Sequence, residues 1–334
     1  MHADGKKATI PTVFNEDERI YLRVWFCHNL ASPFERLNPD RRVVNPALLG
    51  IQSCNEDIIL YVDAVNGNDA NNGLTTDTAK QTIQAAWNLI PALCRQSITI
   101  QVFDGIYRES GVFRDKTVVG DASISIIGNI DHPENVIFSG ADAEAPTVPV
   151  RSTGFNISRL NRIYVKGMRF EYYLTLGIRA ADYSSISISH CQFAMNHTGI
   201  QLTTYTSGNI SDVTIDNDCS SSSNADETYG IRVENSMATV IRTVCTDTGS
   251  AYFCAYMSRV TVRESTADNC RIGFRMWMNS LMYFMSGTKN SEAKNCYLGV
   301  SSRINSTVSY ANFYVTYSGN TTSIQATDGS VIYD

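Results

Sequence analysis

Apolar and polar residues alternate in short stretches that return along the second half of the chain. The clearest stretches start with glycine and cover residues 177–180, 199–202, 230–233, 273–276 and 299–302, with a degenerate copy at 252–255. In most of them the first residue after the glycine is apolar and the second is polar, as in Ile178 and Arg179. A period of two residues is typical of a strand with one buried face. We therefore predict strands whose apolar residues, such as Ile200 and Ile231, point inward.

The spacing of these stretches predicts a solenoid. They begin 21 to 31 residues apart, and a second alternating stretch follows in several repeats, at 185–189, 212–216 and 259–263. A repeat of this length cannot bury its apolar face alone, so neighbouring repeats must stack. Strands joined by Asn-, Asp-, Ser- and Gly-rich corners predict an all-β fold, a right-handed single-stranded parallel β-helix. A leucine-rich horseshoe would need closely spaced leucines that this sequence lacks.

Five of the nine cysteines recur with the repeat, usually after Asn or Asp: Cys191, Cys219, Cys245, Cys270 and Cys296. We predict that they are buried thiols stacked in one interior column. Adjacent coils lie about 4.8 Å apart, which is more than the 3.5–4.5 Å between the Cβ atoms of a disulfide.

The N-terminal part of the chain differs from the repeats. Residues 1–57 are richer in charge and proline and include an apolar run at 20–26. We predict an N-terminal attachment or capping segment at 1–57 and a β-helix domain at 58–334. Within the domain, apolar residues at helical spacing predict one short helix over residues 82–93, limited by Pro91.

The start of the predicted domain contains several short motifs in a fixed order. They are Tyr61-Val62-Asp63, Asn66-Gly67-Asn68-Asp69, Gly73, Thr82-Ile83-Gln84-Ala85-Ala86 and Asp104-Gly105 followed by Tyr107. This opening resembles that of pectate-lyase-like right-handed β-helix proteins, especially those of bacteriophage tail spikes, tail fibres and related virion appendages.

The resemblance implies a virion structural protein that is attached to the particle through its N-terminus and binds host surface glycan. It also implies a homotrimer, because phage β-helix appendages are usually trimers. The superfamily includes enzymes as well, so the alternative is a polysaccharide depolymerase, a lyase or glycoside hydrolase acting on host capsule or lipopolysaccharide. Of the two, the non-catalytic function is our expectation.

Composition and charge argue against several classes of partner. The net charge is −6 and the sequence pI is about 5.4, which argues against nucleic acid as the main partner. The sequence contains no run of 18 apolar residues and no apolar segment within residues 1–15, so we expect neither membrane insertion nor a secretion signal. We expect synthesis in the host cytoplasm, a place on the virion and no cofactor.

Catalysis by a glycoside hydrolase would need two facing carboxylates. The candidates in the repeats are Asp212, Asp216 and Glu234. Acidic residues also occur on any solvated β-face, and the sequence singles out no pair. A pectate-lyase-type site would instead need clustered carboxylates for Ca²⁺ and a nearby Arg or Lys base.

Glycan binding has its own candidates on the outward face beside the glycine stretches. Arg232 and Arg275 share one register, and Glu234, Tyr256 and Trp277 are predicted to follow two residues later. Aromatic faces flanked by Arg and Glu suit a sugar, by ring stacking and directed hydrogen bonds. A mixed polar surface or a subunit contact is the alternative.

Calcium is a further candidate ligand near the start of the domain. Asp63, Asn66, Asn68 and Asp69 would supply oxygen ligands. The same residue types also build tight turns by local hydrogen bonding.

An apolar run at 276–285 predicts a subunit contact. A strand sends only alternate residues inward, so several side chains of the run must face out. The candidates are Trp277, Met278, Leu281, Met282, Tyr283 and Phe284. Such a patch marks an interface, and the aromatic run at 313–317 would extend it. The alternative is that a local loop covers these side chains.

Overall fold

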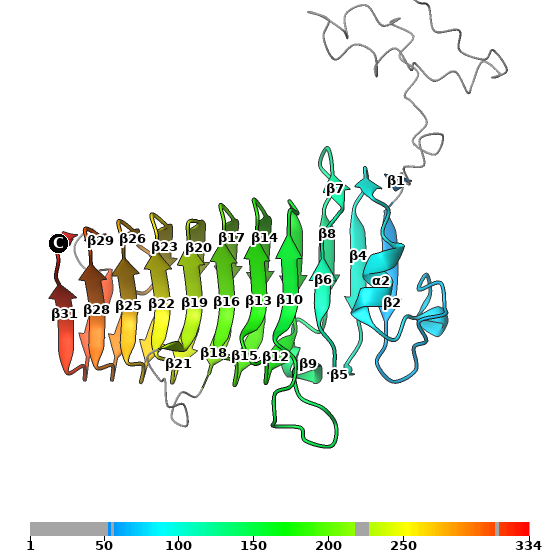
Figure 1. The fold of residues 1–334 in the computed structure, drawn as a ribbon, viewed down its shortest axis with the longest axis horizontal. Helices are drawn as coiled ribbons and strands as arrows, with labels where there is room; N and C mark the ends of the chain where they lie inside the picture. The colour runs from blue at the N-terminus through cyan, green and yellow to red at the C-terminus, as the bar shows by residue number, and fades with distance from the viewer. Residues whose placement is uncertain (1–52, 55–56, 218–226, 311–313, 334) are drawn as a thin grey trace, which may run out of the picture. The chain divides into compact units, whose positions relative to one another are not determined.

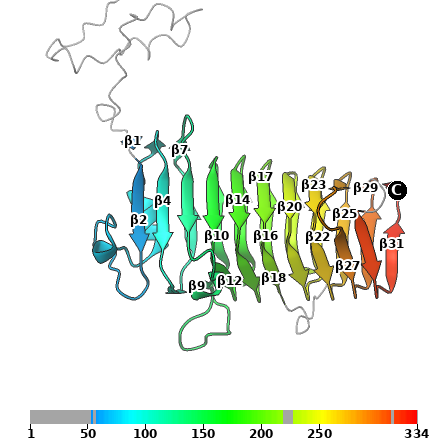
Figure 2. The same cartoon turned by 180° about the vertical axis from the view of Figure 1, so that it is seen from behind.

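The computed structural model describes residues 53–54, 57–217, 227–310 and 314–333. Nearly all of the predicted N-terminal segment lies outside the described residues. The described unit, Cys54–Asp334, is a right-handed parallel β-helix, which confirms the predicted fold class. Figures 1 and 2 show its successive coils stacked side by side from β2 to β31. Among the described residues, no helix has the length and apolarity needed to span a bilayer.

Each regular coil contributes one strand to each of three parallel sheets, which we call sheets I, II and III. Sheet I consists of β2 (Ile58–Val62), β4 (Ile98–Val102), β8 (Ile124–Ile127), β11 (Ile163–Lys166), β14 (Ser185–Ser189), β17 (Ser207–Ser211), β20 (Met237–Ile241), β23 (Arg259–Arg263), β26 (Leu281–Phe284), β29 (Thr307–Tyr310) and β32 (Val331–Tyr333). Sheet II consists of β5 (Gly105–Tyr107), β9 (Val136–Ser139), β12 (Arg169–Glu171), β15 (Gln192–Ala194), β18 (Thr214–Asp216), β21 (Val244–Thr246), β24 (Thr266–Asp268), β27 (Ser291–Lys294) and β30 (Val315–Ser318). Sheet III consists of β6 (Gly111–Phe113), β10 (Thr153–Ser158), β13 (Leu176–Ala181), β16 (Thr198–Thr203), β19 (Tyr229–Glu234), β22 (Ser250–Ala255), β25 (Ile272–Trp277), β28 (Leu298–Arg303) and β31 (Thr322–Ala326).

The glycine stretches form sheet III, and their apolar residues fill the core as predicted. Ile178 pairs with Ile200, and Ile200 with Ile231, and all three are fully buried. The same inward column continues through Tyr252, Phe274 and Val300. Pairing in register lets each coil cover the apolar face of the next, which is why the repeat is stable only as a stack.

The prediction for residues 212–216 is wrong in its boundaries. Asp212 has φ 55 and forms the corner between β17 and β18, so the stretch is a corner followed by a short strand of sheet II. The region 111–162, which looks irregular in sequence, also contains strands of all three sheets. The corner residues break the alternation there, and the sequence pattern alone does not show that it restarts on another sheet.

The first coils carry the helical elements and a small extra sheet. Helix α2 (Ile83–Leu89) begins at the cap Thr82, whose hydroxyl accepts a hydrogen bond from the Ala85 amide. It is shorter than predicted, and it buries Ile83, Ala86 and Trp87 against β2, β4 and β6. The other described elements are η3 (Thr76–Thr78), η4 (Pro133–Asn135), β1 (Ser53–Cys54), β3 (Leu93–Cys94) and β7 (Thr117–Val118).

A ladder of hydroxyl groups lines the inside of the corner between sheets III and I. The backbone N–H of Ser236 donates to the hydroxyl oxygen of Ser258, and the N–H of Ser258 donates to that of Ser280. The ladder runs through Ser184, Thr206, Ser236, Ser258, Ser280, Ser306 and Ser330, with a gap between Ser184 and Thr206. These hydroxyls satisfy buried amides that the tight corner removes from the sheets.

Four of the five repeating cysteines are buried, as predicted: Cys191, Cys245, Cys270 and Cys296. Cys219 lies outside the described residues. The prediction that they form a single column is wrong. Cys245 lies within β21, Cys191 precedes β15, and Cys270 and Cys296 follow β24 and β27.

The predicted contact face at 276–285 is only partly exposed. Met282 and Phe284 point into the core, so their assignment to an interface is wrong. Tyr283 is exposed, and Trp277, Met278 and Leu281 are half-buried. Strand β26 alternates regularly, which divides the apolar run between core and surface.

Candidate functional site

The outward face of sheet III carries a cluster of arginines and aromatic rings on β19, β22 and β25. Arg232, Phe253 and Arg275 are paired in register on successive coils, so their side chains leave the sheet on the same face. Tyr229 and Trp277 lie on the same face, near the two ends of the strands. We call these five residues the arginine–aromatic surface.

The guanidinium groups of this surface lie over the aromatic rings. The Arg232 Cζ atom lies 4.8 Å from the ring centre of Tyr229 and 5.8 Å from that of Phe253. The Arg275 Cζ atom lies 5.2 Å from the ring centre of Phe253 and 5.6 Å from that of Trp277. These distances are in the range of cation–π attraction. The rings therefore hold the two cations in place on an otherwise open face.

The two arginines differ in their partners. Arg232 donates from Nη2 to Glu234 Oε1 at 2.7 Å, and Gln201 Nε2 donates to the other carboxylate oxygen at 3.0 Å. Arg275 makes no ion pair with any residue that the structure describes. Burial lowers the pKa of Arg275, and repulsion from Arg303, Arg271 and Arg232 adds to this effect. The surface thus holds positive charge that an anionic ligand would stabilise.

A histidine lies at the edge of the surface. The ring of His197 is 6.5 Å from that of Tyr229, centre to centre. Burial lowers the pKa of His197; Glu227 opposes this shift in part, and nearby Arg232 adds a smaller lowering effect. His197 is therefore neutral at pH 7 and able to accept a proton.

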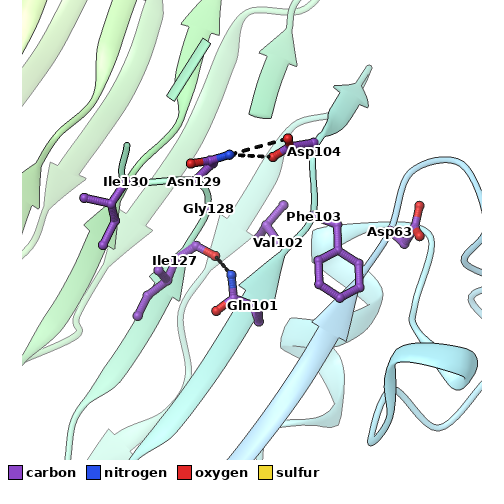
Figure 3. Close-up of a pocket in the computed structure, with 9 residues that line it drawn as sticks. All are labelled: Asp63, Gln101, Val102, Phe103, Asp104, Ile127, Gly128, Asn129 and Ile130. Carbon is purple, nitrogen blue, oxygen red and sulfur yellow. Dashed lines mark hydrogen bonds between the residues drawn. The ribbon is translucent and has the colours of Figure 1, made fainter. Parts of the chain in front are cut away.

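A second candidate is a shallow cavity of about 580 Å³ near the start of the solenoid, between the ends of β4 and β8. Figure 3 shows that its polar side chains already have partners: Asn129 Nδ2 donates to the Asp104 side chain, and Gln101 Nε2 donates to the backbone carbonyl oxygen of Ile127. Asp104 also accepts from Asn135. These groups are already satisfied, so the cavity offers less to a ligand than the arginine–aromatic surface does.

The three predicted catalytic carboxylates do not form a facing pair on one sheet. Asp212 lies at the corner between sheets I and II, where Arg242 Nε and Nη2 donate to its two oxygens at 2.6 and 2.8 Å. These hydrogen bonds hold the pKa of Asp212 below its usual range. Asp216 is exposed at the end of β18, and Glu234 ends β19 on sheet III. The corner geometry separates them although they are close in sequence.

The predicted calcium ligands act as turn residues in the structure. Asp63 Oδ1 accepts from the backbone N–H groups of Val65 and Asn66, and Asn68 Oδ1 accepts from that of Ala70. The Asp69 carboxylate accepts from the amides of Gln81 and Thr82 and from the Thr82 hydroxyl. The contacts of Asp63 and Asn68 agree with the alternative interpretation, local turn chemistry, whereas Asp69 ties the turn to the start of helix α2.

Comparison with known proteins identifies the fold but no family. No protein-family model matches the sequence, and no curated protein matches it. Among solved structures, pectate lyase Pel9A matches with a TM-score of 0.51 and 15% identity, over 78% of this chain and 69% of that one. The chain has the fold of the pectate-lyase-like parallel β-helices.

Other solved structures match over similar lengths. The native GH136 lacto-N-biosidase from Eubacterium ramulus gives a TM-score of 0.50 and 12% identity, over 79% of this chain and 56% of that one. A rhamnogalacturonan lyase gives 0.43 and 13%, over 82% and 74%. This chain thus spans little more than half the length of the lacto-N-biosidase it resembles.

On this pectate-lyase-like scaffold, the structure brings together most of the predicted glycan-binding residues. Arg232, Glu234, Arg275 and Trp277 share the outward face of sheet III. Tyr256 is displaced by one residue, because Ala255 pairs with Glu234 and Trp277 while Tyr256 turns the corner with φ 55. Its ring still lies 6.3 Å from that of Trp277.

Sequence reasoning missed two residues at the centre of the surface. Phe253 occupies the register of Arg232 and Arg275 in the degenerate stretch 252–255, and Tyr229 precedes the glycine of its stretch. An aromatic residue at an outward position, between two arginines of the same register, was the signal that would have identified Phe253.

Proposed function

We propose that this protein is a polysaccharide depolymerase that binds an anionic glycan along the arginine–aromatic surface. The observation that carries the proposal is Arg275, a half-buried cation held over two aromatic rings and without an ion-pair partner among the described residues. A uronate carboxylate would supply the matching charge, and the rings of Tyr229 and Trp277 would stack on neighbouring sugars. The shared fold with pectate lyase Pel9A supports this class of ligand.

β-Elimination suits this surface better than hydrolysis. Hydrolysis needs two carboxylates around the glycosidic bond, whereas both oxygens of Glu234 already accept hydrogen bonds from Arg232 and Gln201. In elimination, Arg275 neutralises the uronate carboxylate and so acidifies the hydrogen on the adjacent ring carbon. Water at the surface accepts that proton, because His197 lies on the coil of β16, three coils or about 14 Å along the solenoid from Arg275. The C–H electron pair becomes a C=C bond as the bond to the leaving oxygen breaks, and water protonates that oxygen.

The test is incubation with polygalacturonate, alginate and hyaluronan, followed by assays for new reducing ends and for the ultraviolet absorbance of an unsaturated uronate. We expect both signals with at least one glycan, and we expect Arg275→Ala to abolish them. Arg179→Gln is the matched control, since Arg179 occupies the same outward column and donates to Asn156. Reducing ends without absorbance would overturn the elimination step. No binding and no cleavage of any anionic glycan would overturn the proposal.

The second candidate function is the virion appendage, and the observation that favours it is the sequence resemblance of residues 61–107. In the structure this opening forms β2, the turn around Asp63 and Asp69, α2 and β5. Under this proposal residues 1–57 attach the protein to other virion proteins, and the β-helix is a homotrimer that presents its outer face to host glycan. Deletion of residues 1–57 should remove the protein from assembled particles. A monomeric mass in light scattering would contradict the trimer.

A further inference from the structure

The corner between sheets III and I is shortest in the coil of β19, where two residues separate the strands β19 and β20. Two consecutive residues with positive φ usually form this corner, as in Thr204 and Tyr205 (φ 55 and 61) and in Tyr256 and Met257 (φ 55 and 62). The coil of β19 has Asn235 alone, at φ 47. Sheet III remains in register before this corner, because Thr203, Glu234 and Ala255 pair in turn. The hydroxyl ladder remains in register after it, through Thr206, Ser236 and Ser258.

The missing residue leaves a notch in the row of exposed corner side chains. Tyr205 lies on one side of the notch and Tyr256 and Met257 on the other, while Met237 and Arg259 line it from sheet I. The cavity measures about 230 Å³. This is below the roughly 300–1,000 Å³ that is typical of pockets for drug-sized ligands. Its size suits a single ring.

The walls of the notch combine an exposed aromatic face with polar groups. Tyr205 is 66% exposed, and Tyr183 stacks on it from the preceding coil with ring centres 5.3 Å apart. The stack restrains the Tyr205 ring before any ligand arrives, which lowers the entropy lost on binding. The Asn235 amide and the Arg259 guanidinium provide hydrogen bonds beside the apolar side chains. A flat apolar wall with directed donors is what the faces and hydroxyls of a pyranose ring require.

The notch is continuous with the arginine–aromatic surface. Tyr256 lines the notch, and its ring lies 6.3 Å from that of Trp277. A glycan that leaves the surface across Trp277 would therefore reach Tyr256 and then the notch. Charge distinguishes the two places: the surface holds unpaired positive charge, whereas the notch is lined mainly by tyrosine and methionine side chains.

We propose that the notch at Asn235 is a binding subsite for one sugar residue of a glycan, and that it takes a neutral pyranose ring stacked on Tyr205. The inference adds to the proposed function a second ligand class at a separate place. The subsite does not depend on Arg275, so the subsite and the proposed function can fail independently of each other.

Binding of a panel of neutral methyl glycopyranosides, with gluco, galacto, manno and N-acetylglucosamine rings, tests the subsite by saturation-transfer NMR and titration. We expect at least one of them to bind, and Tyr205→Ala to weaken its binding by about tenfold, the effect of losing one aromatic stacking contact. Inserting one glycine after Asn235 restores the two-residue corner and should also abolish binding. Circular dichroism and thermal unfolding of both variants check that the coils remain folded.

Two controls separate this inference from the proposed function. Tyr297→Ala removes a tyrosine of similar exposure from the corner between sheets II and III and should leave binding unchanged. Arg275→Ala should weaken the binding of anionic glycans and leave the binding of neutral glycosides unchanged. If no neutral glycoside binds, or if folded Tyr205→Ala binds as the wild type does, the subsite is wrong. Binding of neutral glycosides without binding of any anionic glycan would retain the subsite and overturn the proposed function.

Discussion

The guanidinium carbon of Arg275 lies 5.2 Å from the ring centre of Phe253, which Arg232 approaches from the opposite coil. Although Phe253 occupies an outward position, it is only 2% exposed. Its neighbours on the surface therefore cover it as completely as core residues are covered. This one ring links the folding of sheet III to the placement of both cations.

Phe253→Ala should lower both stability and glycan affinity. Removing a covered ring costs on the order of 3–5 kcal/mol in the free energy of unfolding, and it also leaves Arg232 and Arg275 less restrained. We expect a lower denaturation midpoint and a weaker titration with an anionic glycan. Phe253→Tyr retains the ring and should retain both properties. A variant that loses stability but binds with unchanged affinity would show that Phe253 does not position the arginines.

The hydroxyl ladder predicts a stability effect that depends on one atom. The Ser258 hydroxyl group accepts a hydrogen bond from the N–H of Ser236, and its O–H donates to the Ala255 carbonyl oxygen. Ser258→Ala should lower the free energy of unfolding by about 1–3 kcal/mol, because it leaves a buried N–H without a partner. Ser258→Thr retains the hydroxyl and should cost less.

Urea unfolding followed by circular dichroism measures these changes. Ser207→Ala is the control, because Ser207 is an exposed residue at the start of β17, a strand of the same sheet two coils away. Equal losses for Ser258→Ala and Ser207→Ala would contradict the role of the ladder.

The buried thiols predict slow chemical labelling. Burial raises the pKa of Cys191 and of Cys254 to about 12, and it also raises the pKa of Cys245. Since the thiolate is the reactive form, these cysteines should react with a maleimide only when denaturant opens the coils. Mass spectrometry of peptides from labelled native protein locates each modification. Rapid native labelling of Cys191 or Cys245 would refute their burial.

The sequence could predict those parts of the fold that follow a single period. Ile178, Ile200 and Ile231 alternate with polar residues, so their burial follows from strand geometry. The corners could not be predicted in the same way. His190, Asp212, Arg242 and Glu264 adopt positive φ although they are ordinary polar residues, and no glycine marks the turn.

The site was predictable only in part, because it depends on register between coils. Arg232 and Arg275 follow glycines and can be aligned from the sequence. Phe253 replaces the polar residue of a degenerate stretch. The shorter corner at Asn235 can be recognised only when Glu234 and Ser236 are both aligned with neighbouring coils. Such an alignment requires the pairing that the structure provides.

The last prediction concerns Glu109, which holds the N-terminus of helix α2 through the amides of Ile83 and Gln84. Burial raises the pKa of Glu109 to about 7, and the two amide hydrogen bonds oppose this shift only in part. The unfolded chain titrates near its ordinary value of 4.5. Between these two values the folded protein binds more protons than the unfolded chain, so the free energy of unfolding should fall as pH rises from 4.5 to 7 and then level off. The contribution is on the order of 1–3 kcal/mol.

Glu109→Gln retains an oxygen acceptor for the amides and removes the charge, so it should flatten the profile in this window and stabilise the protein above pH 7. Urea unfolding at several pH values measures both effects, with Glu144→Gln at an exposed position as the control. A slope between pH 4.5 and 7 that is the same in Glu109→Gln and in the wild type would show that another group sets it.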